Sequence, residues 1–233
     1  MAARRKAAKL QQLQQVSEVA ATDGTPDEEM DDTDALVMAA MQGNGEALET
    51  LLDSTQIDVN HKDSIGVAPL HWAAFCGHVS VCQRLLDANA DMHVRDREGR
   101  TPLHVAAYEN QTDCLRLLIG VGAELHSPDK VGWTPLHCAV SNSIERACLM
   151  LTEAGADALA KDAEGKSSMD LAHHFGNQRV VSILEGAQEQ RELLALKGMG
   201  IGSRTVDPAS PHPPRESDPS RSPNSVDSPL ALN

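Results

Sequence analysis

The chain has 233 residues, 41% of them hydrophobic but only 2% aromatic, and its formal net charge is −14. This composition supports a core of Leu, Ala, Val and Ile. A strongly acidic chain lacks the basic field that nucleic acids and anionic membrane surfaces require, so we expect neither as the main partner. There is no run of about 18 apolar residues, and we therefore expect no membrane span.

Residues 1–33 change from basic to acidic along the chain. The basic start, followed by a Gln-rich stretch, is a candidate targeting signal for the nucleus or the mitochondrion, but a frayed, solvated helix is the favoured interpretation. Acids without any Lys or Arg run from Asp23 to Asp34. We expect a mostly flexible linker here. Two other roles stay open: binding a basic partner, or covering Arg97 and Arg100 until a partner displaces the acids.

A 33-residue period organises the middle of the chain. Pro, Leu, His and Ala recur in the same order in successive units, and each set of recurring positions keeps one spacing. Agreement of several such columns is the signature of a repeat architecture. Two of the columns are Gly66, Gly99, Gly132 and Gly165, and His71, His104 and His137.

One unit, residues 99–132, shows the local structure that we predict for each. Thr101 can cap a short Ala-rich helix, and Pro102 occupies a first-turn position that needs no N–H. A second helix is predicted from Thr112 to Ile119, ended by Gly122. The polar residues that follow predict a projecting hairpin or loop.

The motifs APLHWAA, TPLHVAA and TPLHCAV, each followed by a GAD-like turn, resemble the ankyrin-repeat family over residues 34–187. The resemblance implies an all-α ankyrin-repeat solenoid, with helix-turn-helix units and projecting loops. We count about five units, at 34–65, 66–98, 99–131, 132–164 and 165–187, of which the first and last are caps. Residues 188–233 are predicted to form a short helix and then a disordered Ser/Pro-rich tail, whose Ser-Pro pairs are candidate phosphorylation sites.

Nothing in the sequence predicts catalysis, a cofactor or a metal. The five cysteines form no CxxC pair, which indicates reduced thiols in the cytoplasm or the nucleus. No secretory signal is evident in residues 1–20. In the family that this chain resembles, the repeated histidine is structural and bonds backbone groups of adjacent units. No phosphate-binding, hydrolase or zinc-protease motif occurs in the chain. We therefore expect no enzymatic activity.

The resemblance implies that partners bind to the concave face, made by the loop tips and the outward positions of each first helix. Four of the chain's five aromatic residues fall at these outward positions, flanked by basic residues, which suggests a binding stripe. Two alternatives stay open: the Trp before TPLH packs only on the next loop, and Phe75 is half-buried between units. The candidate partner-binding residues are Ile65, Phe75, Arg97, Arg100, Tyr108, Lys130, Trp133 and Asn142.

The expected function is non-catalytic protein–protein binding as an adaptor, scaffold or inhibitor, with the chain itself a monomer. The alternative is a substrate-recruiting or regulatory subunit of a larger enzyme complex, such as a ligase, phosphatase or kinase. The identity of the partner does not follow from the fold.

Overall fold

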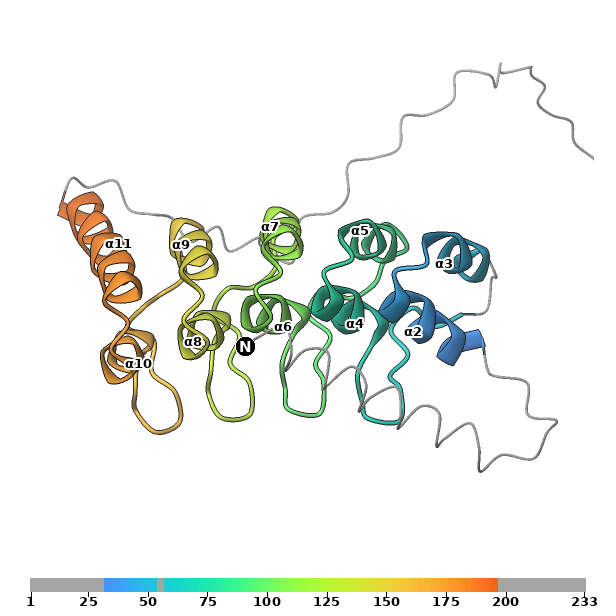
Figure 1. Cartoon of the computed structure of the whole chain (residues 1–233), viewed down its shortest axis with the longest axis horizontal. Helices are drawn as coiled ribbons and strands as arrows, with labels where there is room; N and C mark the ends of the chain where they lie inside the picture. The colour runs from blue at the N-terminus through green and yellow to red at the C-terminus, as the bar shows by residue number, and fades with distance from the viewer. Residues whose placement is uncertain (1–31, 54–56, 197–233) are drawn as a thin grey trace, which may run out of the picture. The chain divides into compact units, whose positions relative to one another are not determined.

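The computed structural model describes residues 32–53 and 57–196, and it arranges them as ten helices in five antiparallel pairs (Figure 1). The first helices of the pairs, called inner helices below, are α2 (Asp32–Gln42), α4 (Pro69–Cys76), α6 (Pro102–Tyr108), α8 (Pro135–Ser141) and α10 (Ser168–Phe175). The second, outer helices are α3 (Gly45–Leu52), α5 (Val79–Asp87), α7 (Thr112–Gly120), α9 (Glu145–Glu153) and α11 (Gln178–Leu196). The predicted all-α solenoid of five units is confirmed.

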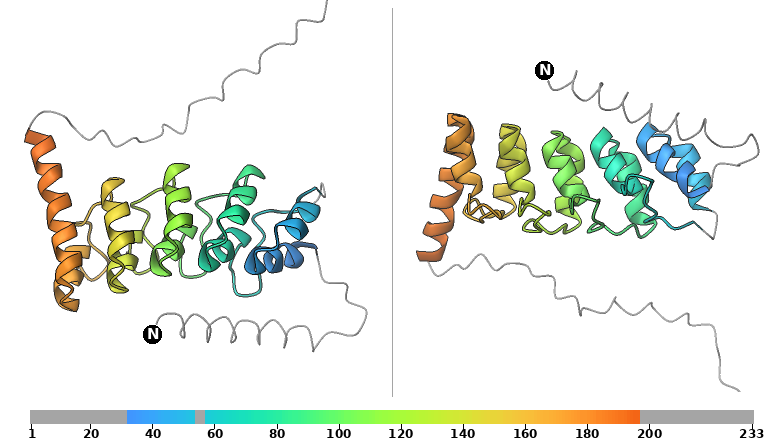
Figure 2. Two further views of the ribbon diagram at one scale, coloured as in Figure 1. Left: turned by 45° about the horizontal axis from the view of Figure 1, so that its top comes forward. Right: turned by 90° about the horizontal axis from the view of Figure 1, so that it is seen from below.

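The pairs stack side by side in chain order, and the loops between successive pairs project from the inner row (Figures 1 and 2). Within the described ranges, the only strand-like pairing is an isolated antiparallel bridge between Lys161 and Ser167. No helix in these ranges is long and apolar enough to cross a membrane. The predictions for residues 1–31, including most of the acidic stretch, and for the Ser/Pro-rich tail lie outside the described residues.

The repeated histidine, rather than the threonine side chain alone, organises the start of the inner helices. Thr101 is the N-cap of α6, as predicted, and Pro102 follows it at the first helical position. The Thr101 N–H donates to Nδ1 of His104 at 3.1 Å, and the Thr101 hydroxyl lies 2.8 Å from the same nitrogen. The second helix of this unit begins at Thr112, as predicted, and its end is marked by Gly122, whose φ of 91° few other residues tolerate.

One continuous hydrophobic core runs between the two rows of helices through all five pairs. It is made mostly of Leu and Ala, and the Leu column of the outer helices is fully buried at Leu85, Leu118, Leu151 and Leu184. A second cluster lies outside this core, on the loop side of the inner helices of the first three pairs. Its buried members are Val37, Met41, Trp72, Phe75 and Val105.

The last outer helix differs from the prediction. We expected a second-helix end near Gly186 and then a separate short helix, but α11 is one 19-residue helix that continues through Gly186. Its distal half is held by Arg191, whose Nη1 lies 3.1 Å from an Asp157 carboxylate oxygen and 3.5 Å from the Ala156 carbonyl. These tertiary contacts offset the low helix propensity of glycine.

Candidate functional site

The inner face is defined here as the projecting loops and the loop-facing side of the inner helices. It is the surface on which the resemblance implied partner binding. Its shape depends on how rigidly successive loops are held against one another.

The repeated histidines fasten each unit to the next one. Nε2 of His71 lies 2.9 Å from the Arg100 carbonyl, and His104 makes the same contact with the Trp133 carbonyl at 3.0 Å. His137 repeats the contact with Lys166 at 3.4 Å. Burial lowers the pKa of all three rings, that of His104 to about 4, so each is neutral at physiological pH. The structural role predicted for these histidines is confirmed.

An aspartate column, which the sequence reasoning missed, shapes each projecting loop. Asp63, Asp96, Asp129 and Asp162 each accept hydrogen bonds from the backbone N–H groups two and four residues further on. Burial alone would raise the pKa of Asp96, but hydrogen bonds from the side chain and backbone of Arg100 hold it below its usual range. The constant spacing of 33 residues was the signal that could have identified this column.

Backbone hydrogen bonds also join neighbouring loop tips directly. The Lys130 N–H donates to the Glu98 carbonyl at 2.9 Å, and the Ala163 N–H donates to the Val131 carbonyl at 3.1 Å. The loop tips that precede α4 and α6 are linked by a side chain instead, since the Arg97 guanidinium donates to the Ser64 carbonyl. The loop tips therefore form a connected edge.

Several predicted binding residues are exposed on this inner face. Tyr108 is 39% exposed at the end of α6, and Arg97 and Lys130 are exposed at the loop tips. Asn142 is also exposed, but its side-chain amide donates to the Tyr108 carbonyl at 2.7 Å and so also serves to join two units. Val131, at a loop tip, is 56% exposed.

The prediction that Phe75 points outward is wrong. Phe75 is only 6% exposed, and its ring packs edge-on against Trp72 with the ring centroids 5.9 Å apart. Both rings belong to the second hydrophobic cluster, together with Met41 and Val105 from the neighbouring units. The alternative of burial between units is the one that the structure shows, so the aromatic residues do not form a continuous exposed stripe.

The side chains of Trp133 and Arg100 form hydrogen bonds within the repeat structure. Trp133 is half-buried against the core, and its indole N–H donates to Asp162 of the next loop at 3.2 Å. Arg100 donates through Nε and Nη2 to the Asp96 carboxylate, at 2.8 and 2.7 Å. Trp133 thus packs on the next loop, as one of the two alternatives described. A role of Trp133 or Arg100 in binding stays a prediction.

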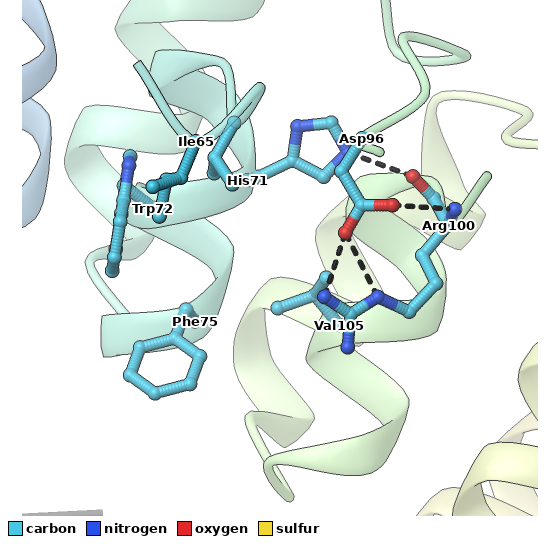
Figure 3. A pocket seen from close by; sticks show the side chains of 8 residues that line it. Ile65, His71, Trp72, Phe75, Asp96, Arg100 and Val105 are labelled. Atoms are coloured by element: carbon cyan, nitrogen blue, oxygen red, sulfur yellow. Dashed lines mark hydrogen bonds and ion pairs between the residues drawn. The ribbon is translucent and has the colours of Figure 1, made fainter. Parts of the chain in front are cut away.

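A pocket of about 90 Å³ opens between the second and third units (Figure 3). Ile65, half-buried in the projecting loop, lines it together with the aromatic pair Trp72 and Phe75 of α4. Asp96 and Arg100 form its polar wall. Of the predicted binding residues, the structure therefore brings Ile65, Phe75 and Arg100 together.

Within the described ranges, no three His, Cys, Asp or Glu side chains are placed to hold a metal ion. Four of the five cysteines are buried and Cys76 is half-buried. Burial raises the pKa of Cys138 and of Cys148 to about 12, which makes these thiols unreactive.

The stacked helix pairs, with their histidine and aspartate columns, define an all-α repeat solenoid. The chain matches the family described as ankyrin repeats (3 copies) over residues 1–96 and 83–162. It therefore belongs to the ankyrin-repeat family.

Curated relatives match over a much shorter stretch. The chain is 38% identical over 58 residues to palmitoyltransferase akr1 of Aspergillus oryzae, and 39% identical over 59 residues to palmitoyltransferase akr1 of Schizosaccharomyces pombe. Palmitoyltransferase AKR1 of Gibberella zeae is 32% identical over 60 residues. Each match covers 25 or 26% of this chain but only 8 or 9% of the relative, so the chain spans less than a tenth of these enzymes.

Proposed function

We propose that this protein is a non-catalytic interaction module that binds protein partners on its inner face, as an adaptor, scaffold or inhibitor. Ankyrin repeats generally mediate protein–protein interactions, and membership of that family supports the proposal. The buried, unreactive thiols and neutral structural histidines are consistent with a frame without catalytic groups. Free thiols of this kind favour the cytoplasm or the nucleus as the compartment.

The observation that carries the proposal is the contrast between a fixed frame and exposed apolar side chains on the same face. The loops are held by repeated side-chain and backbone bonds, whereas Tyr108 and Val131 remain 39% and 56% exposed. Tyr is enriched at protein interfaces and among their hot spots, and exposed apolar residues on a rigid surface lose little conformational entropy when a partner covers them.

The test is affinity capture of partners by the full chain, compared with a Tyr108→Ala/Val131→Ala variant. Leu149→Ala is the matched control, because Leu149 is also apolar and 44% exposed but lies on the outer helix α9. We expect the inner-face variant to lose specific partners that the control retains. Circular dichroism of both variants should match that of the native chain, because the altered side chains lie largely at the surface.

Equal capture of every partner by the native chain and by the inner-face variant would contradict the proposal. For each partner that the variant loses, the dissociation constant should be measured with the purified partner. Truncation of an interface anchor costs more than about 1 kcal/mol, so a direct partner should bind the variant about five- to tenfold more weakly.

A second candidate is a recruiting or regulatory part of a larger enzyme assembly. The observation in its favour is that the curated relatives named above are palmitoyltransferases that share one segment with this chain. In that case a catalytic partner should co-purify in constant stoichiometry, and its turnover of a protein substrate should fall with the Tyr108→Ala/Val131→Ala variant. Capture of partners without any associated enzyme would exclude this second candidate and favour a stand-alone adaptor.

A further inference from the structure

The pocket between the second and third units has the walls of a side-chain socket. Ile65 comes from the projecting loop, Trp72 and Phe75 from α4, and Val105 from α6 (Figure 3). Trp72 is fixed in place because its indole N–H donates to Asp63 at 2.8 Å and its ring packs against Phe75. The apolar walls are therefore preformed, which favours binding because they need not be ordered when a partner arrives.

The volume of the pocket limits what it can hold. An apolar cavity of about 150 Å³ holds a benzene molecule. At about 90 Å³, this pocket suits an aliphatic side chain, such as that of Leu, Ile or Met, better than an aromatic ring. Binding energy concentrates in well-packed, desolvated pockets near the centre of an interface, so a side chain that fills this pocket would act as an anchor.

The polar wall of the pocket adds a preference for charge. Asp96 accepts from Nε and Nη2 of Arg100, and no described residue accepts from Nη1. A guanidinium carries five N–H donors, so Arg100 can hold Asp96 and a second carboxylate together. His71 adds no charge here, because its Nε2 is bonded to the Arg100 carbonyl and burial lowers its pKa.

The charges around the pocket also favour a negatively charged partner. Residues 95–100 carry three arginines against two acids, a local excess of one positive charge in a chain whose net charge is −14. Arg97, exposed at the loop tip, lies in this stretch, two residues before the Gly99 turn. An acidic group beside an aliphatic anchor would therefore meet favourable charges at this pocket and unfavourable ones over an acidic protein as a whole.

The geometry points to this pocket as the anchor site for a partner segment with an aliphatic residue next to an acidic residue, the aliphatic side chain entering between Trp72, Phe75 and Val105 and the carboxylate pairing with Arg100. This assignment rests on the proposed function, because it names the partner chemistry that the inner face selects. It specifies the second and third units as the place where selection occurs.

The test begins with a phage-displayed random decapeptide library selected on the intact chain. The peptides recovered are synthesised, and their dissociation constants are measured by fluorescence anisotropy. We expect the recovered peptides to share an aliphatic–acid pair. In a two-dimensional ¹⁵N–¹H spectrum, these peptides should shift the indole N–H signal of Trp72 and leave that of Trp133, the only other Trp, in place.

Matched variants then locate the binding. Ile65→Glu alters the pocket mouth, and the repeat frame accepts Glu there because Glu98 and Glu164 occupy the equivalent positions. Leu149→Glu introduces the same charge at an exposed apolar residue of the outer helix α9, outside both the pocket and the inner face. We expect Ile65→Glu to weaken binding by at least about tenfold, and Leu149→Glu by less than about twofold.

A double-mutant cycle tests the preference for an acid. Changing the acid of the peptide to its amide should weaken binding to the native chain by about fivefold. The same change should not weaken binding to the Arg100→Gln variant further, as expected for two directly coupled groups. Equal losses of affinity in both proteins would show that Arg100 does not bind the acid of the peptide. The charge preference in the assignment would then be overturned.

Other results would overturn the assignment as a whole. Recovery of peptides without the pair, or unchanged binding by Ile65→Glu, would exclude the pocket. If such peptides still lose affinity for the Tyr108→Ala/Val131→Ala variant, the proposed function stands and only the pocket is wrong. A synthetic peptide of residues 23–32, which places Met30 among acids, serves as competitor. If it binds the pocket more tightly than any selected peptide, the occupant is this chain's own segment rather than a partner.

Discussion

Acidification from about pH 7.5 to about pH 5 is expected to destabilise the repeat array through its buried histidines, with His104 as the clearest case. His104 is completely buried, and its Nδ1 accepts from the Thr101 N–H while Nε2 lies 3.0 Å from the Trp133 carbonyl. Nδ1 must be unprotonated to accept, and Nε2 must carry the proton to donate. Protonating the ring would break the first bond and place a charge in the core.

The size of the effect follows from the two pKa values. Burial lowers the pKa of His104 from 6.5 to about 4 in the folded state. Between those values the unfolded chain holds the additional proton, so this stability is present above pH 6.5 and is lost as the pH falls toward 4. The complete loss amounts to about 3 kcal/mol, of which about 2 kcal/mol is gone by pH 5. Lowered pKa values at His71 and His137 act in the same direction.

The assay is urea unfolding followed by circular dichroism at the two pH values, for the native chain and for His104→Gln. The variant loses stability at neutral pH, because it lacks a well-formed inter-unit bond. Its loss on acidification should nevertheless be smaller than that of the native chain by about 2 kcal/mol, because one titrating group has been removed. Coincident transitions at different wavelengths are needed first, since repeat arrays can unfold in parts.

An equal loss on acidification in both proteins would refute the reasoning. A direct measurement supports the comparison, since the ring proton signals of His104 can be followed by NMR as the pH is lowered. Titration close to the ordinary histidine value in the folded chain would mean that burial does not act as described.

Three other changes test the frame, each by one measurement. Ser168 stands where the second, third and fourth units have Pro, and its buried hydroxyl has no partner in the described part of the chain. Ser168→Pro should therefore raise the free energy of unfolding by about 1 kcal/mol in urea titrations. Gly132→Ala should lower the melting temperature and cost more than about 1 kcal/mol, because φ is +82° and the new Cβ would lie 2.5 Å from the Ala163 nitrogen. Under native conditions a thiol reagent should modify Cys76 first, and mass spectrometry should find the four buried cysteines modified only after unfolding.

The frame could be predicted from the sequence because it is periodic. A position that makes the same contact in successive units keeps one residue type, so His71, His104 and His137 could be identified from the sequence. The column of Asp63 and its equivalents has the same 33-residue period and could have been identified in the same way. Its hydrogen bonds explain why it repeats.

The candidate site could be predicted only in part, because its residues break the period. The register of α4 places Phe75 on the loop side, but it does not say what covers that side. Burial of Phe75 depends on Met41 in the first unit and Val105 in the third, two positions that the repeat leaves variable. In the same way, the continuation of α11 depends on Arg191 meeting Asp157, a contact with no counterpart in the period.

The variable positions that remain exposed set a further condition on partners. At the position of Ile65, the successive units carry Ile65, Glu98, Val131 and Glu164, so apolar and acidic side chains alternate along the loop tips. A partner that runs along these tips meets an acid in every second unit, and a uniformly acidic segment would be repelled twice. Preference for an acid can therefore apply only locally, where the three arginines of residues 95–100 outnumber Asp96 and Glu98. The pocket lies between these same two units. Its volume and the positive charge beside it therefore select the same short segment of a partner.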